Sequence, residues 1–139
     1  VEAPWEIEAL LEHTDGAVLG LVFDTGHYLY GTGANEPEQV LEGLERFQGR
    51  LWYVHYKDCH PAVASEARRL GWDYKQAVGR GVFCELGRGQ IDFGAVTRKL
   101  EALGYDGWIV VEQDVLPGMG EPRTSAAHNR EYLRQVTGR

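Results

Sequence analysis

Short apolar runs alternate along this chain with segments whose apolar residues recur at helical spacing. Nearly continuous apolar runs predict three strands that are buried on both faces of a sheet, at Ala17–Phe23, Leu51–Tyr56 and Trp108–Gln113. Amphipathic patterns with capping residues predict four helices, at Pro4–His13, Asn35–Phe47, Phe93–Leu103 and Thr124–Val136. Strands that alternate with helices are typical of an α/β fold with a parallel sheet and right-handed crossovers.

The second and third strands are separated by a long irregular stretch. It runs from Lys57 to Gln90, with room for short helices near Val63–Leu70 and Tyr74–Val78. A connection of this length usually carries function.

Three strand–helix units cannot close a barrel, and an open three-stranded sheet leaves an edge and one face uncovered. We therefore expect residues 1–139 to be a single domain fragment. It would be part of a larger barrel, or a half-barrel that pairs with another chain.

Composition narrows the classes of function. The chain has 139 residues, of which 43% are hydrophobic and 25% charged, and a formal net charge of −7. Without a basic run, a nucleic-acid partner is not expected. No apolar run is long enough for a membrane span and VEAPWEIEAL is not a secretory signal, so we expect a cytoplasmic protein. Cys59 and Cys84 form no CxxC pair and are expected to be free thiols.

Strong polar residues stand where each predicted strand ends. Asp24, His55 and Glu112 follow or close the three apolar runs, and the carboxyl ends of parallel barrel strands converge on one rim. Carboxylate and imidazole donors suit Mn²⁺, Mg²⁺, Co²⁺ or Zn²⁺. Taken singly, Asp24 could cap a loop and His55 could be a satisfied core histidine. Glu112 would be costly to bury without a cation or partner.

Four motifs resemble those of the sugar phosphate isomerase/epimerase family, within the xylose isomerase-like superfamily. They are FDTGH (23–27), HYKD (55–58), GRGQIDF (87–93) and VVEQD (110–114). GVFCELGRGQIDF and EQDVLPGMGEPRTSAAHNREYLR are most similar to the branch of inosose (2-keto-myo-inositol) dehydratases. The resemblance implies the C-terminal part of a (β/α)8 TIM barrel, with strands equivalent to the sixth, seventh and eighth.

The resemblance also implies roles for individual residues. Asp24, His55 and Glu112 match the family's metal ligands, and a further ligand would come from a strand upstream of this chain. His27 matches a histidine that contacts substrate, and Lys57 matches a motif lysine near the pocket. The remaining match is Glu2, which resembles an acidic residue that faces substrate.

Two further residues are candidates for substrate binding. Arg88, in a glycine-flanked turn, could place its guanidinium over a polyol oxygen, although a surface role is as good an interpretation. Trp72, in the long connection, is the better candidate for a pocket wall than Trp52 or Trp108, which are expected to pack in the core.

Together these features predict a divalent-metal-dependent dehydratase, with Mn²⁺ as first choice, acting on a small cyclic polyol ketone through an enediolate. Glu112 is the first candidate for the base, with Lys57 nearby, and His27 could orient or protonate a leaving hydroxyl. The same chemistry also fits a sugar epimerase or isomerase, and dehydration is preferred from the resemblance alone.

Other classes remain open, because half a barrel could serve as a non-catalytic sugar-binding or assembly module. A homo-oligomer is also compatible with the sequence. A DNA-repair endonuclease of the same superfamily is disfavoured by the acidic charge.

Overall fold

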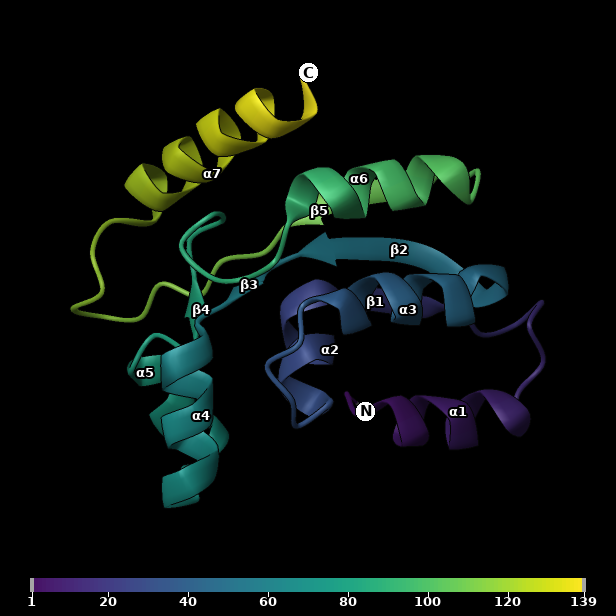
Figure 1. Cartoon of the computed structure of the whole chain (residues 1–139), viewed down its shortest axis with the longest axis horizontal. Coiled ribbons are helices and arrows are strands. Elements are labelled where there is room, and N and C mark those ends of the chain that lie inside the picture. Colours follow the sequence, from purple (N-terminus) through teal and green to yellow (C-terminus); the bar gives the residue numbers. More distant parts are fainter. Residues whose placement is uncertain (1, 139) are drawn as a thin grey trace.

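Three parallel strands form the sheet on which the rest of the chain is arranged. They are β1 (Leu21–Asp24), β2 (Leu51–Tyr56) and β5 (Trp108–Val111), in the spatial order β1-β2-β5. Our computed structural model describes residues 2–138, drawn as a ribbon in Figure 1. In the strand register Asp24 lies beside His55, and His55 lies beside Val110. The carboxyl ends of the three strands are therefore level, as the sequence predicted for a parallel sheet.

Helices cover one face of the sheet. Helix α1 (Pro4–Glu12) precedes β1. Helix α3 (Glu38–Arg46) and the 3-10 helix η1 (Gln48–Arg50) lead into β2. Helix α6 (Phe93–Ala102) leads into β5, and α7 (Pro122–Thr137) follows β5. In this layer α3 packs on α6 and α6 packs on α7 (Figure 1). No helix within residues 2–138 has the length and apolar character needed to cross a membrane.

The core lies between this helical layer and the sheet. The sheet contributes Phe23, Val54 and Tyr56 to this core, and the helices supply Val40, Leu44, Phe93, Val96 and Leu100 among others. These are the apolar positions that the helical spacing places on one face of each helix.

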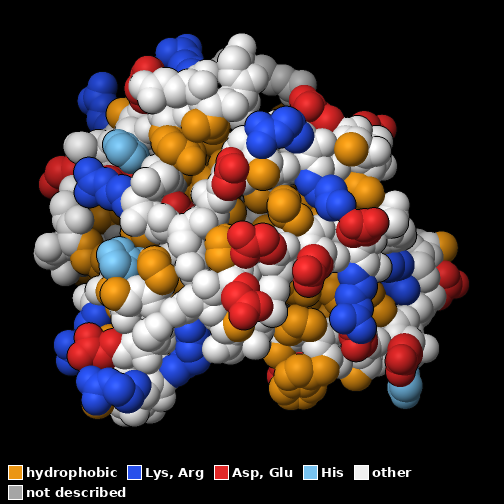
Figure 2. All heavy atoms as spheres, viewed as in Figure 1, with side chains coloured by type: hydrophobic (Ala, Val, Ile, Leu, Met, Phe, Trp, Pro, Cys, Tyr) orange, Lys and Arg blue, Asp and Glu red, His pale blue; other side chains and the backbone are white. Residues whose placement is uncertain are grey.

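The opposite face of the sheet is open. Val22 is 59% exposed and Trp108 is 74% exposed, although both are large apolar residues. On the helical side of the sheet, a groove of about 780 Å³ runs between β5 and α7, with Ile109, Val111 and Leu133 in its lining. Figure 2 shows apolar side chains gathered beside α7. An uncovered face and edge are what the sequence predicted for part of a barrel.

The long connection after β2 folds into a small unit of its own. It contains β3 (Asp58–Cys59), α4 (Pro61–Leu70), α5 (Tyr74–Gly79) and β4 (Phe83–Cys84). Strands β3 and β4 pair antiparallel, while α4 and α5 lie side by side away from the main sheet (Figure 1). The two helices agree with the sequence prediction, but the strand pair was not predicted because two-residue strands leave no periodic pattern.

The structure also corrects one boundary and adds one helix near β1. The strand begins at Leu21 rather than Ala17, because the preceding residues form a turn in which Val18 is 77% exposed. A helix that the sequence analysis missed, α2 (Thr25–Gly31), follows the strand without a loop. Asp24 caps it by accepting a hydrogen bond from the His27 backbone N–H at 2.9 Å.

A buried carboxylate holds the second half of the long connection against β3. Asp58 Oδ1 accepts hydrogen bonds from the backbone N–H groups of Cys59 (2.9 Å) and Ile91 (3.2 Å). Its Oδ2 accepts from those of Gly87 and Gly89, both at 2.9 Å. Burial raises the pKa of Asp58, and the four hydrogen bonds oppose that shift. The HYKD and GRGQIDF motifs are thus joined by one side chain.

We expect Asp58→Asn to destabilise the complete protein. An amide has one acceptor oxygen, so its NH2 group would face either the Gly87 and Gly89 donors or those of Cys59 and Ile91. Two backbone donors would be left unpaired, at a cost of about 2–4 kcal/mol. Thermal and urea unfolding measure this loss.

Asp92→Asn is the matched control for this change. Asp92 caps α6 through its side chain, and asparagine caps a helix about as well as aspartate. Equal stability of the two variants would show that Asp58 does not hold the connection.

Candidate functional site

The ends of the three parallel strands bring Asp24, His55 and Glu112 together. Asp24 is the last residue of β1, His55 lies one residue before the end of β2, and Glu112 directly follows β5. The Nδ1 atom of His55 is 2.5 Å from Glu112 Oε2 and 3.6 Å from Asp24 Oδ2. The structure therefore places these three predicted ligands in contact around one point, and their role as ligands stays a prediction.

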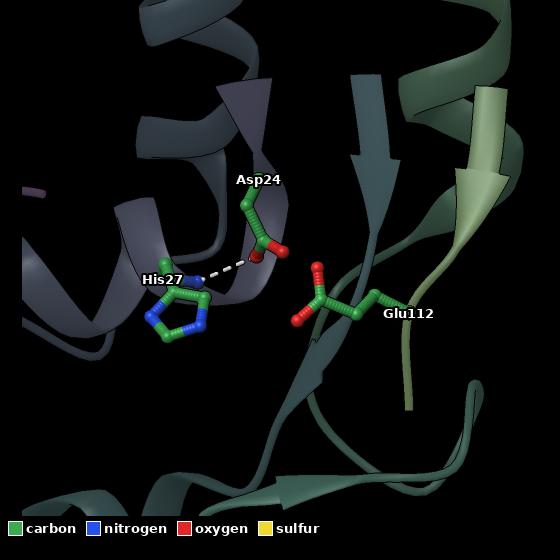
Figure 3. Close-up of side chains that lie close together, drawn as sticks. All are labelled: Asp24, His27 and Glu112. Atoms are coloured by element: carbon green, nitrogen blue, oxygen red, sulfur yellow. Dashed lines mark hydrogen bonds between the residues drawn. The ribbon is translucent and has the colours of Figure 1, made fainter. Parts of the chain in front are cut away.

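A second histidine joins this cluster. His27 stands in the first turn of α2, where its backbone N–H bonds to Asp24. Asp24, His27 and Glu112 each offer one donor atom, and these atoms all lie within 4.8 Å of one another. In Figure 3 the two carboxylates face each other and the His27 ring lies beside them. Two imidazoles, not one, are thus available beside the carboxylates.

One carboxylate oxygen in this cluster accepts no hydrogen bond, although His55 Nδ1 lies 3.6 Å from it. Within residues 2–138, Asp24 Oδ2 is buried and has no hydrogen bond. Burial raises the pKa of Asp24, although the hydrogen bond from His27 and the charge of Lys57 oppose the shift. A buried unpaired carboxylate oxygen is costly, and a cation would remove that cost. The donor set of carboxylates and imidazole therefore fits a divalent metal ion.

The ammonium group of Lys57 lies on the other side of Glu112. Lys57 Nζ donates hydrogen bonds to Glu112 Oε1 at 2.7 Å and to Asp114 Oδ2 at 3.0 Å. The side chain is only 1% exposed, and its Nζ sits 4.7 Å from the centre of the Phe83 ring. Burial lowers the pKa of Lys57, but the two carboxylates outweigh it and leave the pKa above its ordinary value. Lys57 is therefore a fixed positive charge at neutral pH.

The backbone of Lys57 is held as firmly as its side chain. The hydroxyl of Thr25 donates to the Lys57 carbonyl at 2.8 Å and accepts from the Lys57 N–H at 3.0 Å. Gly26 allows this approach, since a Cβ there would lie 2.8 Å from Lys57 Cγ. The start of α2 and the end of β2 are thereby locked together.

Lys57 also determines where the proton of His27 resides. Lys57 Nζ is 3.2 Å from His27 Nε2, and an ammonium can only donate, so Nε2 is the acceptor. The proton of the neutral imidazole is then on Nδ1, which lies 3.0 Å from Glu2 Oε1. Glu2, predicted to face substrate, thus reaches the cluster through His27.

Glu112 is held as an anion. Burial raises its pKa, but the hydrogen bond and charge of Lys57 and the contact with His55 outweigh burial and lower the pKa overall. Asp114, two residues further on, shares the Lys57 ammonium and was not among the predicted site residues. The alternating spacing of Glu112 and Asp114 after β5 was the available signal.

Two predicted substrate residues lie outside the cluster. Arg88 is paired with Glu85 at 2.9 Å and its side chain is 65% exposed, although both residues line a depression of about 170 Å³ that Asp114 also lines. The Trp72 ring lies 4.3 Å below the guanidinium of Arg80. Another aromatic residue of the same connection, Tyr74, stacks on His27 instead.

The groove between β5 and α7 does not mark this site. Its lining mixes apolar residues with polar and basic ones, and it contains none of the clustered histidines or carboxylates. A smaller pocket of about 200 Å³ reaches the cluster from the β1 side, and its lining includes Glu2, Asp24 and His27. The candidate site is therefore identified by the side chains that line it and not by the volume of the pocket.

The comparisons with a family model and with curated proteins agree with each other. Residues 2–136 match the family model described as xylose isomerase-like TIM barrel. The chain is 41% identical over 133 residues to an inosose dehydratase of Geobacillus kaustophilus (strain HTA426), covering 96% of this chain and 42% of that protein. An inosose dehydratase of Klebsiella pneumoniae (strain 342) is 36% identical and is matched over 99% of this chain and 45% of its own length. The chain thus spans less than half the length of the curated relatives it matches.

Solved structures agree on the fold. A xylose isomerase domain protein from Planctomyces limnophilus superposes with a TM-score of 0.71 at 23% identity, covering 94% of this chain and 42% of that one. A D-tagatose 3-epimerase-like protein gives a TM-score of 0.57 at 26% identity, covering 94% and 40%. The predicted fold, part of a (β/α)8 barrel, is confirmed by these matches and by the three-stranded parallel sheet.

We expect Lys57→Met to lower the stability of the complete protein by about 2 kcal/mol. The change keeps an apolar chain of similar length but leaves Glu112 and Asp114 without their cation. Partial exposure of both carboxylates limits the cost, because water screens them. Chemical denaturation of both proteins measures it.

Lys99→Met serves as the control, since Lys99 pairs with the exposed Glu45. Loss of such a surface pair costs less than about 1 kcal/mol. A Lys57 variant no less stable than the Lys99 variant would contradict a central role for the buried ammonium.

Proposed function

Because this chain belongs to the xylose isomerase-like TIM-barrel family, we propose that it is the C-terminal part of a divalent-metal-dependent dehydratase acting on inosose, a cyclic polyol ketone. The observation that carries this proposal is the convergence of Asp24, His55 and Glu112 at the carboxyl ends of three adjacent strands. Similarity to inosose dehydratases supports the choice of substrate and reaction.

In this proposal Asp24, His55 and Glu112 hold the metal ion, and the remaining barrel, in the same chain or another, adds a further ligand. The unpaired oxygen of Asp24 supports the assignment. Mn²⁺ is the first candidate, while Co²⁺, Mg²⁺ and Zn²⁺ accept the same donors. When bound, the ion supplies a Lewis acid that acidifies the C–H beside the substrate carbonyl and stabilises an enediolate.

In the proposed reaction, residues of this chain carry out the proton transfers. Glu112, kept anionic by Lys57 and His55, takes the proton from the carbon next to the carbonyl. His27, with its tautomer set by Glu2 and Lys57, orients the β-hydroxyl, and the proton that Glu112 removed is passed to this hydroxyl as it leaves as water. Lys57 supplies the positive charge behind both groups, and its raised pKa keeps it protonated.

Substrate hydroxyls would meet the chain at its rim. We assign Glu2, which contacts His27, and Arg88, whose guanidinium is exposed beside the depression lined by Asp114. Trp72 has at most an indirect part in the pocket wall, because Arg80 covers its ring. A cytoplasmic homo-oligomer remains part of the proposal.

A sugar epimerase or isomerase is the second candidate, since reprotonation of the same enediolate would give it. The structural similarity to a D-tagatose 3-epimerase-like protein favours this candidate. A non-catalytic sugar-binding or assembly module is the third, and a lack of bound metal would favour it.

We predict that the complete protein, supplied with Mn²⁺, converts 2-keto-myo-inositol to the dehydrated dione. Glu112→Gln should lower kcat/KM by at least about 1,000-fold, because it removes both a base and a charged ligand. Product formation followed by mass spectrometry measures the rate, and circular dichroism checks the fold. Glu66→Gln, which alters an exposed pair with Arg69, is the control and should keep full activity.

Two results would change this assignment. Turnover of a ketohexose without turnover of the inosose would favour the epimerase. Activity retained in the Glu112 variant would remove this residue from the mechanism.

Metal binding itself gives a separate prediction. After removal of metal with a chelator, calorimetric titration with Mn²⁺ should show one ion per chain, and Asp24→Asn should weaken its binding at least about 100-fold. His55→Ala should weaken it far more than His27→Ala if His55 is the imidazole ligand. The reverse order would identify His27 as the ligand, and no stoichiometric ion would leave only the non-catalytic module.

A further inference from the structure

The aromatic residue that overlooks the cluster is Tyr74. It is the first residue of α5 and is 52% exposed. Its ring lies nearly parallel to that of His27, with centroids 5.9 Å apart and an interplanar angle of 14°. One side of Tyr74 is thus placed against a residue of the proposed site while the rest of the ring remains open.

The backbone beneath Tyr74 is fixed by a capping box. Asp73 Oδ1 accepts from the Gln76 N–H at 2.8 Å, and Gln76 Oε1 accepts from the Asp73 N–H at 3.0 Å. Ala77 and Val78, in the next turn of α5, are buried in the core. A ring held on such a base binds a ligand with little loss of conformational entropy.

The hydroxyl of Tyr74 is free to donate. Among residues 2–138 it has no hydrogen-bond partner in the structure. Burial raises the pKa of Tyr74, and the nearby charge of Asp114 adds to the rise, so the hydroxyl keeps its proton at neutral pH. The stacking of the Tyr74 ring on that of His27 places this residue beside the cluster.

Trp72, two residues away, offers no such surface. The guanidinium of Arg80 covers its ring at 4.3 Å, and the ring packs against the core. Of these two aromatic residues in the connection between β3 and β4, only Tyr74 has an open ring surface at the site.

We propose that Tyr74 forms an aromatic wall that recognises the C–H face of a cyclic polyol and makes the site select ring-shaped substrates. The inference rests on the proposed function for the identity of the substrate. The C–H groups on one face of a saturated ring pack against an aromatic ring by dispersion, while the Tyr74 hydroxyl can bond to a substrate hydroxyl. An acyclic polyol presents no rigid face and gains little from such a wall.

The test uses two probes with the same number of hydroxyls. Myo-inositol is cyclic and D-glucitol is acyclic, and neither carries the reactive carbonyl. Calorimetric titration of the complete, metal-loaded protein should show that Tyr74→Ala weakens myo-inositol binding about five- to ten-fold. D-glucitol binding should change by less than about two-fold, and Mn²⁺ affinity should not change.

Kinetics and two further variants complete the design. Tyr74→Ala should raise KM for the inosose by the same factor as it weakens myo-inositol binding, and should leave kcat nearly unchanged. Tyr74→Phe keeps the ring and should stay within about three-fold of the unsubstituted protein. Trp5→Ala removes another exposed aromatic ring, 69% exposed on α1, and should alter neither probe.

Several outcomes would contradict the proposed aromatic wall. They are unchanged myo-inositol binding in Tyr74→Ala, equal loss of both probes, or no binding of either probe to the unsubstituted protein. Inosose turnover with no effect of Tyr74 would reject the wall and leave the proposed function standing. Loss of myo-inositol binding in Tyr74→Ala without any inosose turnover would support the wall and reject the proposed function.

Discussion

The buried ammonium of Lys57 is the charge on which the arrangement of the site depends. Three carboxylates, those of Asp24, Glu112 and Asp114, lie around it, and two of them bond to it directly. Without a cation, like charges this close would raise one another's pKa and push the side chains apart. Lys57 removes that repulsion on one side of Glu112. Asp24 on the other side keeps a buried oxygen that accepts no hydrogen bond, which a further cation could bind.

Two neighbouring residues have different roles: Lys57 sets the charge of the site, and Asp58 holds the backbone of the connection in place. Their side chains leave the chain in different directions: Lys57 enters the cluster, whereas Asp58 binds the backbone N–H groups that begin and end the GRGQI turn. The same two residues therefore set the charge of the site and fix the connection that surrounds it. A change at Lys57 acts first on the charge of the site, and a change at Asp58 acts first on the connection.

The sequence predicted those parts of the site that strand ends determine. Asp24, His55 and Glu112 could be located because each follows an apolar run, and parallel strands align their ends. Asp114 and Tyr74 could not be located this way. Asp114 belongs to the site because it bonds to Lys57, and Tyr74 belongs to it because it stacks on His27. Both contacts join residues that are far apart in the sequence, so only the folded structure shows them. Trp72 was preferred to Trp52 and Trp108 because it lies in the long connection, but the guanidinium of Arg80 covers its ring.

The open face of the sheet affects the strength of the electrostatic interactions in the site. His55 and Glu112 are 23% and 40% exposed at their side chains, on the same face as Val22 and Trp108. The chain spans less than half the length of its curated relatives, so the rest of a barrel would cover this face. Excluding water there would lower the local dielectric, strengthen the Lys57–Glu112 pair and make the unpaired Asp24 oxygen still more costly. The charges of the site are thus set within this chain, but their strength depends on barrel closure.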